Sequence, residues 1–219
     1  MARNYQNELE KIIEKNKAAG RIPSLCLHSC CAPCSSYVLE YLSAYFKITV
    51  FYYNPNIYPE KEYWKRVSEQ RELLKQLPAK YPISFVEGAY EKERFYKVTT
   101  GMEHLPEGRE RCFACYKLRL QEAAKWSAQE GFDYFTTSLS ISPLKNAEKL
   151  NEIGERLAEE YQVAYLPSDF KKKNGYQRSI ELSKTFGLYR QDYCGCIFSK
   201  QEREAYQAKT CIKAQNVLD

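Results

Sequence analysis

The stretch SLCLHSCCAPCSSYVLEYLSAYF, residues 24–46, runs from a short apolar segment through a thiol-rich loop into a longer segment. Residues 24–28 predict a buried strand, and residues 36–46 predict a helix. Cys30, Cys31 and Cys34 fall within five positions between these two elements. A strand that ends in such a loop and is followed by a helix is typical of the first unit of an α/β sheet.

The rest of the chain continues the alternation of strand and helix. Further strands are predicted at 47–54, 83–88, 132–142 and 163–170, with helices near 64–77, 113–131 and 145–161 and a last helix from about 198. This order predicts an α/β fold, a three-layer parallel sheet with helices on both faces and a helical C-terminal part. We expect a single domain over 1–219, with an N-terminal helix at 1–21, a catalytic core at 22–203 and a tail at 204–219.

The composition restricts the chemistry of the thiols. The first twenty residues lack the apolar core of a signal peptide, and no later run approaches the roughly 18 apolar residues of a membrane span. We therefore expect a cytoplasmic protein with no membrane partner, in a compartment where thiols are kept reduced. Nine cysteines, an odd number, then favour metal binding or redox chemistry over a disulfide framework. The net charge of +5 permits a polyanionic partner without requiring one.

Seven cysteines fall into three clusters, CCAPC, CFAC and CGC: Cys30, Cys31, Cys34, Cys112, Cys115, Cys194 and Cys196. Because the carboxyl ends of parallel strands meet at one edge of the sheet, we expect these clusters to converge there. Four thiolates bind either a tetrahedral zinc or an iron–sulfur cluster, and spacing alone does not separate the two. Seven are too many for a closed zinc site, which favours a cluster plus a second site. Cys26 is interpreted as core filling and Cys211 as a spare thiol.

Several other residues flank the expected edge. His28 ends the first strand as a proton donor, a partner of the metal ligands or a packed strand end. Asp169 follows the fifth strand as an iron ligand, a proton source or a helix N-cap. The basic run beyond it is either a solvated surface or a phosphate contact: Lys171, Lys172, Lys173 and Arg178.

Five motifs in this order carry a resemblance: LHSCCAPCSS, YNPNIYPEKEYWKR, PEGRERCFACYKLRL, TTSLSISPLKN and GLYRQDYCGCIFS. Together they cover roughly residues 22–200 and resemble the cobalamin-independent epoxyqueuosine reductases, the QueH family. The resemblance implies a fold akin to the adenine-nucleotide alpha-hydrolase (HUP, PP-loop) class. It also implies an oxidoreductase that removes the epoxide oxygen of epoxyqueuosine in tRNA, the last step of queuosine biosynthesis, with a [4Fe-4S] cluster and a neighbouring mononuclear iron.

The resemblance also implies roles for individual residues. Carried over to matching positions, the cluster ligands are Cys30, Cys31, Cys112 and Cys115. Cys194 and Cys196 form the second redox element, as iron ligands or as a redox-active disulfide, with Asp169 completing a metal site. Cys34 is assigned to the second metal, but the same pattern also allows Cys34 as a cluster ligand in place of Cys30 or Cys31. Asp169 or His28 delivers protons, with no choice between them.

A tRNA partner implies residues that hold a nucleotide turned out of the anticodon loop. Candidate stacking tyrosines are Tyr52, Tyr53, Tyr58, Tyr116 and Tyr176, and candidate backbone contacts are Lys145, Lys171, Lys172, Lys173, Arg178 and Arg190. The electron donor is expected to be a ferredoxin- or flavodoxin-like protein. Two alternatives remain, an ATP-dependent tRNA-thiolating enzyme of the same fold and a zinc-stabilised RNA-binding module. The loop CCAPCSS has no glycine with which to hold a triphosphate, which disfavours the former.

Overall fold

The computed structural model describes residues 3–215, with side chains through residue 210. The side chain of Cys211 therefore lies outside the described residues. The elements, in chain order, are α1 (Tyr5–Ala18), β1 (Ser24–His28), α2 (Ala32–Leu42), β2 (Lys47–Tyr52), α3 (Glu60–Gln76), β3 (Ser84–Glu87), α4 (Lys92–Thr99), α5 (Glu110–Gln129), β4 (Tyr134–Thr137), the 3₁₀ turn η1 (Ser138–Ile141), α6 (Ala147–Tyr161), β5 (Ala164–Tyr165), α7 (Gly175–Thr185) and α8 (Ile197–Gln215).

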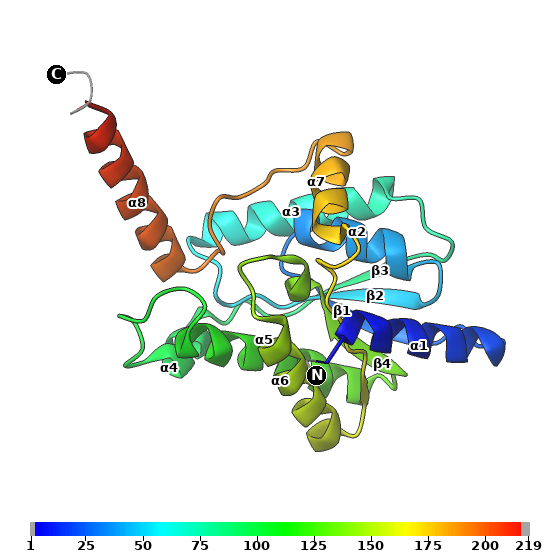
Figure 1. The fold of residues 1–219 in the computed structure, drawn as a ribbon. Coiled ribbons are helices and arrows are strands. Elements are labelled where there is room, and N and C mark those ends of the chain that lie inside the picture. The colour runs from blue at the N-terminus through cyan, green and yellow to red at the C-terminus, as the bar shows by residue number, and fades with distance from the viewer. Residues whose placement is uncertain (1–2, 216–219) are drawn as a thin grey trace.

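The five strands form one parallel sheet in the order β3-β2-β1-β4-β5 (Figure 1). The chain leaves β1 toward β2 and β3 on one side and later returns to β4 and β5 on the other. The carboxyl ends of β1 and β4 therefore flank the switch point, where open α/β sheets bind ligands. The predicted α/β fold with a parallel sheet covered on both faces is confirmed.

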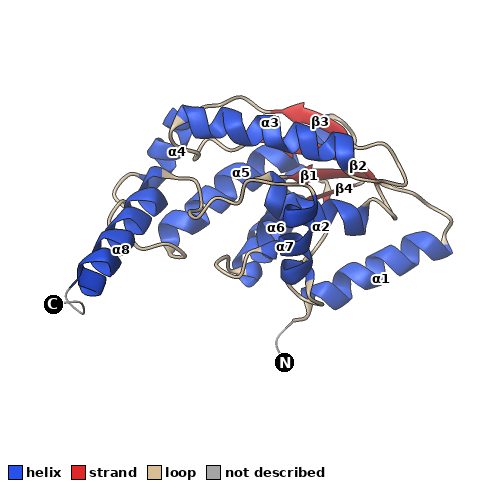
Figure 2. Cartoon of the chain, turned by 90° about the horizontal axis from the view of Figure 1, so that it is seen from above, coloured by secondary structure: helices blue, strands red, loops and turns tan. Residues whose placement is uncertain are grey.

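Alternate residues of β1 face two separate cores. Leu25 and Leu27 pack with apolar residues of α1, α2 and α3, whereas Cys26 packs with those of α4, α5 and α6. Figure 1 shows α2 and α3 on one side of the sheet and α4, α5 and α6 on the other, and both Figures 1 and 2 show α8 extending away from the body. Leu27 is fully buried, so its truncation to alanine is expected to cost about 2–5 kcal/mol. Cys26 is also fully buried, in agreement with its interpretation as core filling.

The fourth and fifth strands are shorter than the sequence predicted. β4 stops at Thr137 rather than at 142, because the Thr137 hydroxyl accepts a hydrogen bond from the backbone N–H of Leu139 at 3.1 Å and the chain turns into η1. β5 spans two residues rather than 163–170, since the ladder with β4 ends at Phe135 and Tyr165 and the carbonyl of Leu166 accepts from the side-chain hydroxyl of Thr136 at 2.8 Å. The last bond between two backbone groups of these segments joins the N–H of Leu166 to the carbonyl of Phe135 at 2.9 Å. The segments that follow β4 and β5 therefore leave the ladder and form the rim at the carboxyl edge of the sheet.

The helices also differ from the prediction at their ends. α2 begins at Ala32 rather than at 36, with Pro33 in its first turn, where the missing N–H of proline has no cost. Cys34 therefore belongs to that turn and not to a preceding loop. α4 was not predicted, although Phe95 and Thr99 form a buried stripe along it. The division of the chain into core and tail stays a prediction.

None of the helices within residues 3–215 combines the length and the apolar character needed to cross a bilayer.

Candidate metal centre

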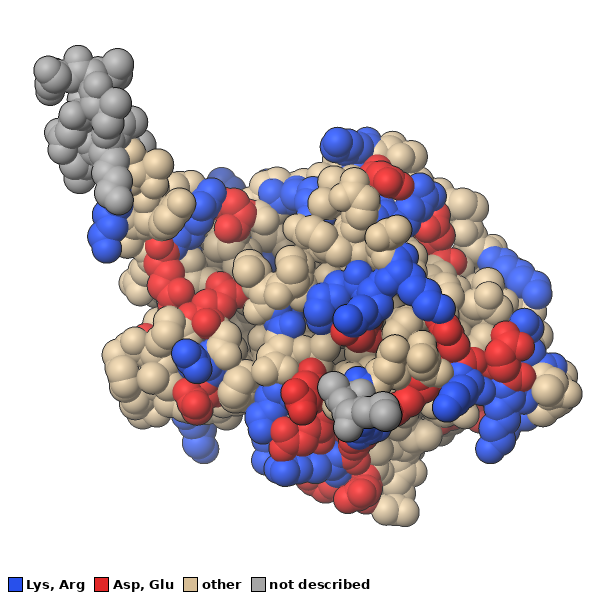
Figure 3. Space-filling view, in the orientation of Figure 1, with Lys and Arg blue, Asp and Glu red and all other residues tan. Residues whose placement is uncertain are grey.

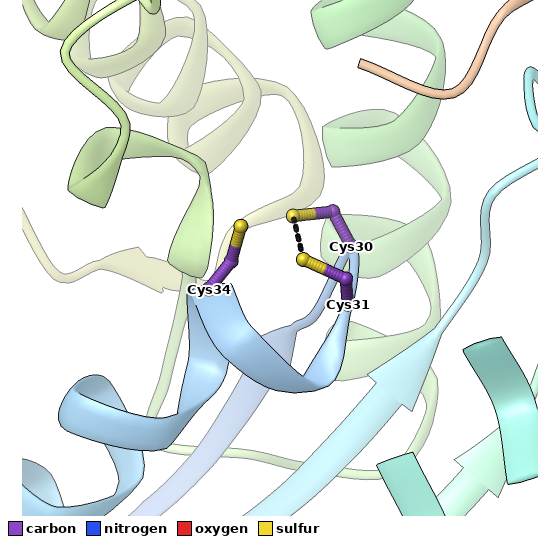
Figure 4. Close-up of side chains that lie close together, drawn as sticks. All are labelled: Cys30, Cys31 and Cys34. Carbon is purple, nitrogen blue, oxygen red and sulfur yellow. Dashed lines mark hydrogen bonds between the residues drawn. The ribbon is translucent and has the colours of Figure 1, made fainter. Parts of the chain in front are cut away.

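The thiols of Cys30, Cys31 and Cys34 point toward one another at the start of α2 (Figure 4). The Sγ atoms of Cys30 and Cys31 are 3.8 Å apart, and all three Sγ atoms lie within 4.8 Å of one another. Cys31 is buried, and the other two are partly exposed. Sulfur ligands at these separations can bind a metal, so we call these residues the first thiol group.

The sheet and α3 hold the loop that carries the first thiol group. The N–H of Ser29 donates to the carbonyl of Phe51 at 3.1 Å, which extends the β1–β2 ladder by one bond. The amide oxygen of Gln70 accepts hydrogen bonds from Ser29 at 2.7 Å and Ser35 at 2.9 Å, on either side of the thiols. Cys31 is the N-cap of α2 in extended conformation and makes no capping bond through its side chain. The positive end of the helix thus begins at the thiols, where it favours thiolate.

Hydrogen bonds within the first thiol group favour one thiolate. Bonds from Cys31 and Cys34 hold the pKa of the Cys30 thiol well below its ordinary value, against the effect of burial. The pKa of Cys34 is raised, mainly by its bond to Cys30, and burial raises that of Cys31. A bound cation would displace the remaining protons, because thiolate and not thiol is the ligand.

Four further cysteines line a second, smaller hollow. Cys112 and Cys115 lie in the first two turns of α5, and Cys194 and Cys196 lie at the end of the loop before α8. The N–H of Gly108 donates to the Sγ of Cys112 at 3.2 Å. Burial raises the pKa of Cys112 and of Cys196, and that of Cys115 to about 12. We call these four residues the second thiol group.

The Cys-Gly-Cys turn of the second thiol group is fixed by contacts with the start of α3. Gly195 has a φ of +128°, a conformation that L side chains rarely adopt. Its carbonyl accepts a hydrogen bond from the N–H of Tyr58 at 2.8 Å. The carbonyl of Cys194 accepts another from Nη1 of Arg66 at 3.3 Å. The backbone therefore orients both thiols.

Lys145 reaches the second thiol group from the loop before α6. Its Nζ lies 3.0 Å from the Sγ of Cys194 and 2.9 Å from Oε1 of Glu107, and the residue is 8% exposed. Burial alone would lower the pKa of Lys145, but Cys194, Tyr116 and Glu107 together raise it well above its ordinary value. The side chain stays charged beside Cys194. The sequence predicted a tRNA contact for Lys145, whereas here both of these partners are intramolecular.

A cavity of about 530 Å³ adjoins both thiol groups. Its wall includes Cys30 and Cys34 of the first group and Cys194 of the second. The remaining wall comes mainly from α5, η1, the segment after η1, α7, the loop before α8 and α8 itself. Its polar and apolar side chains include Arg119, Leu139, Ile141, Leu144, Lys145, Tyr176, Arg190 and Arg203. Leu144 is 71% exposed at this wall. The volume falls in the range of sites for small molecules or single nucleotides.

His28 is the last residue of β1 and is fully buried between the neighbouring strands β2 and β4. Its Nδ1 lies 2.9 Å from Oγ1 of Thr137, and its Nε2 lies 3.1 Å from the carbonyl oxygen of Tyr53. Burial, reinforced by the charge of Arg119, lowers the pKa of His28 to about 3. This is the geometry of a packed strand end, one of the three interpretations that the sequence left open. Proton delivery by His28 stays a prediction.

Asp169 lies just beyond β5 and is 8% exposed. Its Oδ1 accepts a bond from Nζ of Lys171 at 2.6 Å. Asp169 is neither part of the first thiol group nor among the residues of the two cavity walls. Its role as an iron ligand therefore stays a prediction.

The predicted RNA contacts are placed in two different environments. Lys173 pairs with Glu10, and Arg178 pairs with Glu40 at 2.7 Å, away from the cavity wall. Lys172 is exposed, also away from that wall. Of the basic candidates, Arg190 and Lys145 line the cavity.

The candidate tyrosines also divide into residues away from the cavity wall and one residue that lines it. Tyr52, Tyr53 and Tyr116 are buried within the core, and Tyr58 is 39% exposed outside the cavity wall. Tyr176 lines the cavity, with the guanidinium of Arg190 over its ring at 5.9 Å from the ring centre. Stacking by Tyr53 would require the core to open.

Sequence reasoning missed two residues of the centre, Arg119 and Glu107. Arg119 follows Cys115 by four positions on α5, so both share one face of that helix. The spacing within RCFACYKLR was a signal that could have identified it. Glu107 lies 38 residues before its partner Lys145, and nothing local links the two.

A family profile and several known proteins that match this sequence all carry the same name. The profile of the family described as epoxyqueuosine reductase QueH matches residues 25–202. A protein of that name from Staphylococcus epidermidis is 42% identical over 204 residues, covering 91% of this chain and 86% of the relative. One from Streptococcus pyogenes is 39% identical over 96% of this chain and 84% of the relative, and one from Thermotoga maritima is 34% identical over 85% and 95%.

Proposed function

Because this chain belongs to the epoxyqueuosine reductase QueH family, we propose that it reduces epoxyqueuosine in tRNA to queuosine. The reaction consumes two electrons and two protons, breaks both carbon–oxygen bonds of the epoxide, leaves a carbon–carbon double bond and releases water. One observation carries the proposal beyond family membership. Two thiol groups from separate segments adjoin one cavity at the switch point of the sheet.

The proposal includes a [4Fe-4S] cluster held by Cys30, Cys31, Cys112 and Cys115. The donor set supports this assignment, since soft sulfur ligands suit iron–sulfur centres and the Sγ atoms of Cys30 and Cys31 lie 3.8 Å apart. When bound, such a cluster supplies electrons one at a time. The external donor in this proposal is a ferredoxin- or flavodoxin-like protein.

A second, mononuclear iron is proposed at Cys34, Cys194, Cys196 and Asp169. Cys194 at the cavity wall supports a site close to the substrate. Asp169 would have to exchange its bond with Lys171 for the metal. In the alternative arrangement, Cys194 and Cys196 form a redox-active disulfide and no second iron is bound.

In this proposal, residues of the chain itself bind and orient the modified base and supply a proton for the reaction. Apolar residues of η1 exclude water from the cavity, and Tyr176 offers a ring for stacking on the modified base. Lys145 holds a proton at Nζ on the cavity wall, whereas His28 is neutral and lies behind it. The Nζ of Lys145 is therefore our first candidate for the proton source.

Contacts at the cavity, rather than one broad positive face, are proposed to hold the tRNA. Basic and acidic side chains are mixed over the face seen in Figure 3. Arg190 and Arg203 lie at the cavity wall, where a phosphate next to an extruded nucleotide would come within their reach. Because the basic run at 171–173 lies away from this wall, we assign it a smaller part.

The test is anaerobic purification with iron, sulfide and zinc analysis, followed by incubation with tRNA that contains epoxyqueuosine and a chemical reductant. We expect iron and sulfide in similar amounts, and mass spectrometry of the digested tRNA should show loss of one oxygen atom from the modified nucleoside. Turnover that requires ATP would support the thiolating alternative instead. A colourless zinc protein without turnover would support the RNA-binding module.

A further inference from the structure

Arg119 is a buried cation that pairs with no carboxylate among the side chains that the structure describes. It is 1% exposed and is among the largest fully buried side chains of the chain. Its Nη1 donates to Oδ1 of Asn54 at 3.2 Å, and its Nε donates to the carbonyl of Cys115 at 3.4 Å. Its Nη2 has no hydrogen-bond partner among the described residues. A buried guanidinium with neutral acceptors only and a free donor is strongly unfavourable unless an anion lies nearby.

Two other buried arginines show what compensation looks like in this protein. Arg66 is paired with Glu62 at 2.7 Å. Arg111, eight residues before Arg119 on α5, is paired with Glu202 at 2.9 Å and also donates to the carbonyl of Glu103 at 2.8 Å. Among the residues with described side chains, no carboxylate forms such a pair with Arg119. Its counterion must be sought among the thiols.

The position of Arg119 fits that requirement. It lines both the large cavity and the small hollow, so it lies between the two thiol groups. Asn54 ties it to the first thiol group, because the side-chain amide of Asn54 also donates to the carbonyl of Ser29 at 2.8 Å. Burial would lower the pKa of Arg119, but negative charge at Cys115, Cys194 and Cys30 raises it, so the guanidinium stays charged.

We propose that Arg119 is the countercharge of the metal centre and sets its reduction potential, with the free Nη2 donating to a sulfur atom. This inference rests on the proposed function. Fixed positive charge and N–H donors near the sulfur atoms stabilise the reduced state, which carries one more negative charge than the oxidised state. Arg119 thereby makes the centre easier to reduce by a ferredoxin- or flavodoxin-like donor.

The experiment compares the parent protein with Arg119→Gln, Arg119→Lys and Arg111→Gln. All four are purified anaerobically, analysed for iron and sulfide, and titrated for the midpoint potential of the centre without tRNA. Arg111→Gln is the matched control, because it removes a buried charge at the same hollow on the same helix but one that has its own carboxylate. The readout does not depend on deoxygenation.

We expect Arg119→Gln to make one-electron reduction at least tenfold less favourable, a negative shift of about 59 mV or more. Arg119→Lys keeps the charge and is expected to shift less than Arg119→Gln, and Arg111→Gln is expected to shift less than either. An unchanged potential in Arg119→Gln, or an equal shift in Arg111→Gln, would overturn the proposal.

If Arg119→Gln binds less iron than the parent, the iron content and midpoint potential of Arg119→Lys decide whether the proposal holds. Full iron content and a shift below about 59 mV in Arg119→Lys support the countercharge, since the lysine restores only the charge. Loss of iron in Arg119→Lys as well would overturn it. A parent with a titratable centre but no deoxygenation refutes the proposed function alone, whereas a parent without a redox-active centre refutes both.

Discussion

The two thiol groups are built in different ways. The thiols of the first group lie within five positions of the chain, and three Sγ atoms lie within 4.8 Å of one another, with Gln70 of α3 bonded to Ser29 and Ser35 on either side of them. The second group joins the start of α5 to a loop before α8, and its geometry depends on Lys145, Arg66 and the backbone of Tyr58. The ligands of the first group are therefore neighbours in the sequence, whereas those of the second group are brought together only by tertiary contacts. The second group should therefore be more sensitive to changes outside its own cysteines.

The largest expected effect comes from removing a proposed cluster ligand of the second group. Cys115→Ala should lose the cluster and lower kcat/KM by more than about 100-fold, because replacing a ligand exceeds the effect of removing a partner of one. Iron content and deoxygenation of tRNA measure this. Cys34→Ala should retain the four-iron cluster and lose only the second iron.

Cys26→Ala is the matched control for these variants. Cys26 is fully buried on β1 outside both thiol groups, so its truncation should lower the free energy of unfolding without loss of iron. Equal iron loss in Cys26→Ala and Cys115→Ala would mean that the effect reflects folding rather than ligation.

The second prediction breaks the tertiary support of Cys194. Lys145→Met removes the charged bond to its Sγ and should lower kcat/KM by about 10–100-fold, with the cluster iron retained. Lys149→Met is the control, since that lysine pairs with Glu152 near the surface of α6. If Lys145→Met behaved like Lys149→Met, Lys145 would have no part in the centre.

The difference between neighbours in the sequence and groups joined by tertiary contacts also explains what the sequence could predict. The alternation of elements predicted the parallel sheet, and the order of strands and loops predicted that the three cysteine clusters lie at its carboxyl edge. The early end of β4 was missed because a single hydrogen bond from the N–H of Leu139 to the side chain of Thr137 overrides the strand propensity of the residues after it. The pairing of Lys145 with Glu107 was missed because the two residues lie 38 positions apart in the chain, and the tRNA contact of Lys145 stays a prediction. Local spacing is readable from sequence, whereas pairing of distant charges is not.

A third prediction compares the cavity wall with the exposed basic run. Arg190→Glu should weaken tRNA binding by about tenfold and reduce its salt dependence by about one unit of slope, because one phosphate contact is lost. Lys172→Glu reverses an exposed charge away from the wall and should have a smaller effect. Binding measured at several salt concentrations separates the two, and a larger effect of Lys172→Glu would move the RNA contact to the basic run.

The smallest expected effect concerns the loop that leads to the second thiol group. The carboxylate of Glu69 accepts a hydrogen bond from the N–H of Tyr189, and burial raises the pKa of Glu69 above its ordinary value. The native state then holds this proton more tightly than the unfolded state. The stabilising contribution of Glu69 is therefore present below the unfolded pKa and is lost as the pH rises through the folded pKa.

Glu69→Gln tests this small contribution, since its amide oxygen can still accept the bond from Tyr189. The variant should be more stable than the parent at about pH 8 by about 0.5 kcal/mol, a small value because the group is partly exposed, and the difference should shrink at about pH 5. Urea unfolding at both pH values measures it. Glu72→Gln, at an exposed site on the same helix, is the control. If Glu69→Gln were less stable than the parent at the higher pH, the negative charge itself would be holding the loop, and the support of the second thiol group would be more electrostatic than its hydrogen bonds suggest.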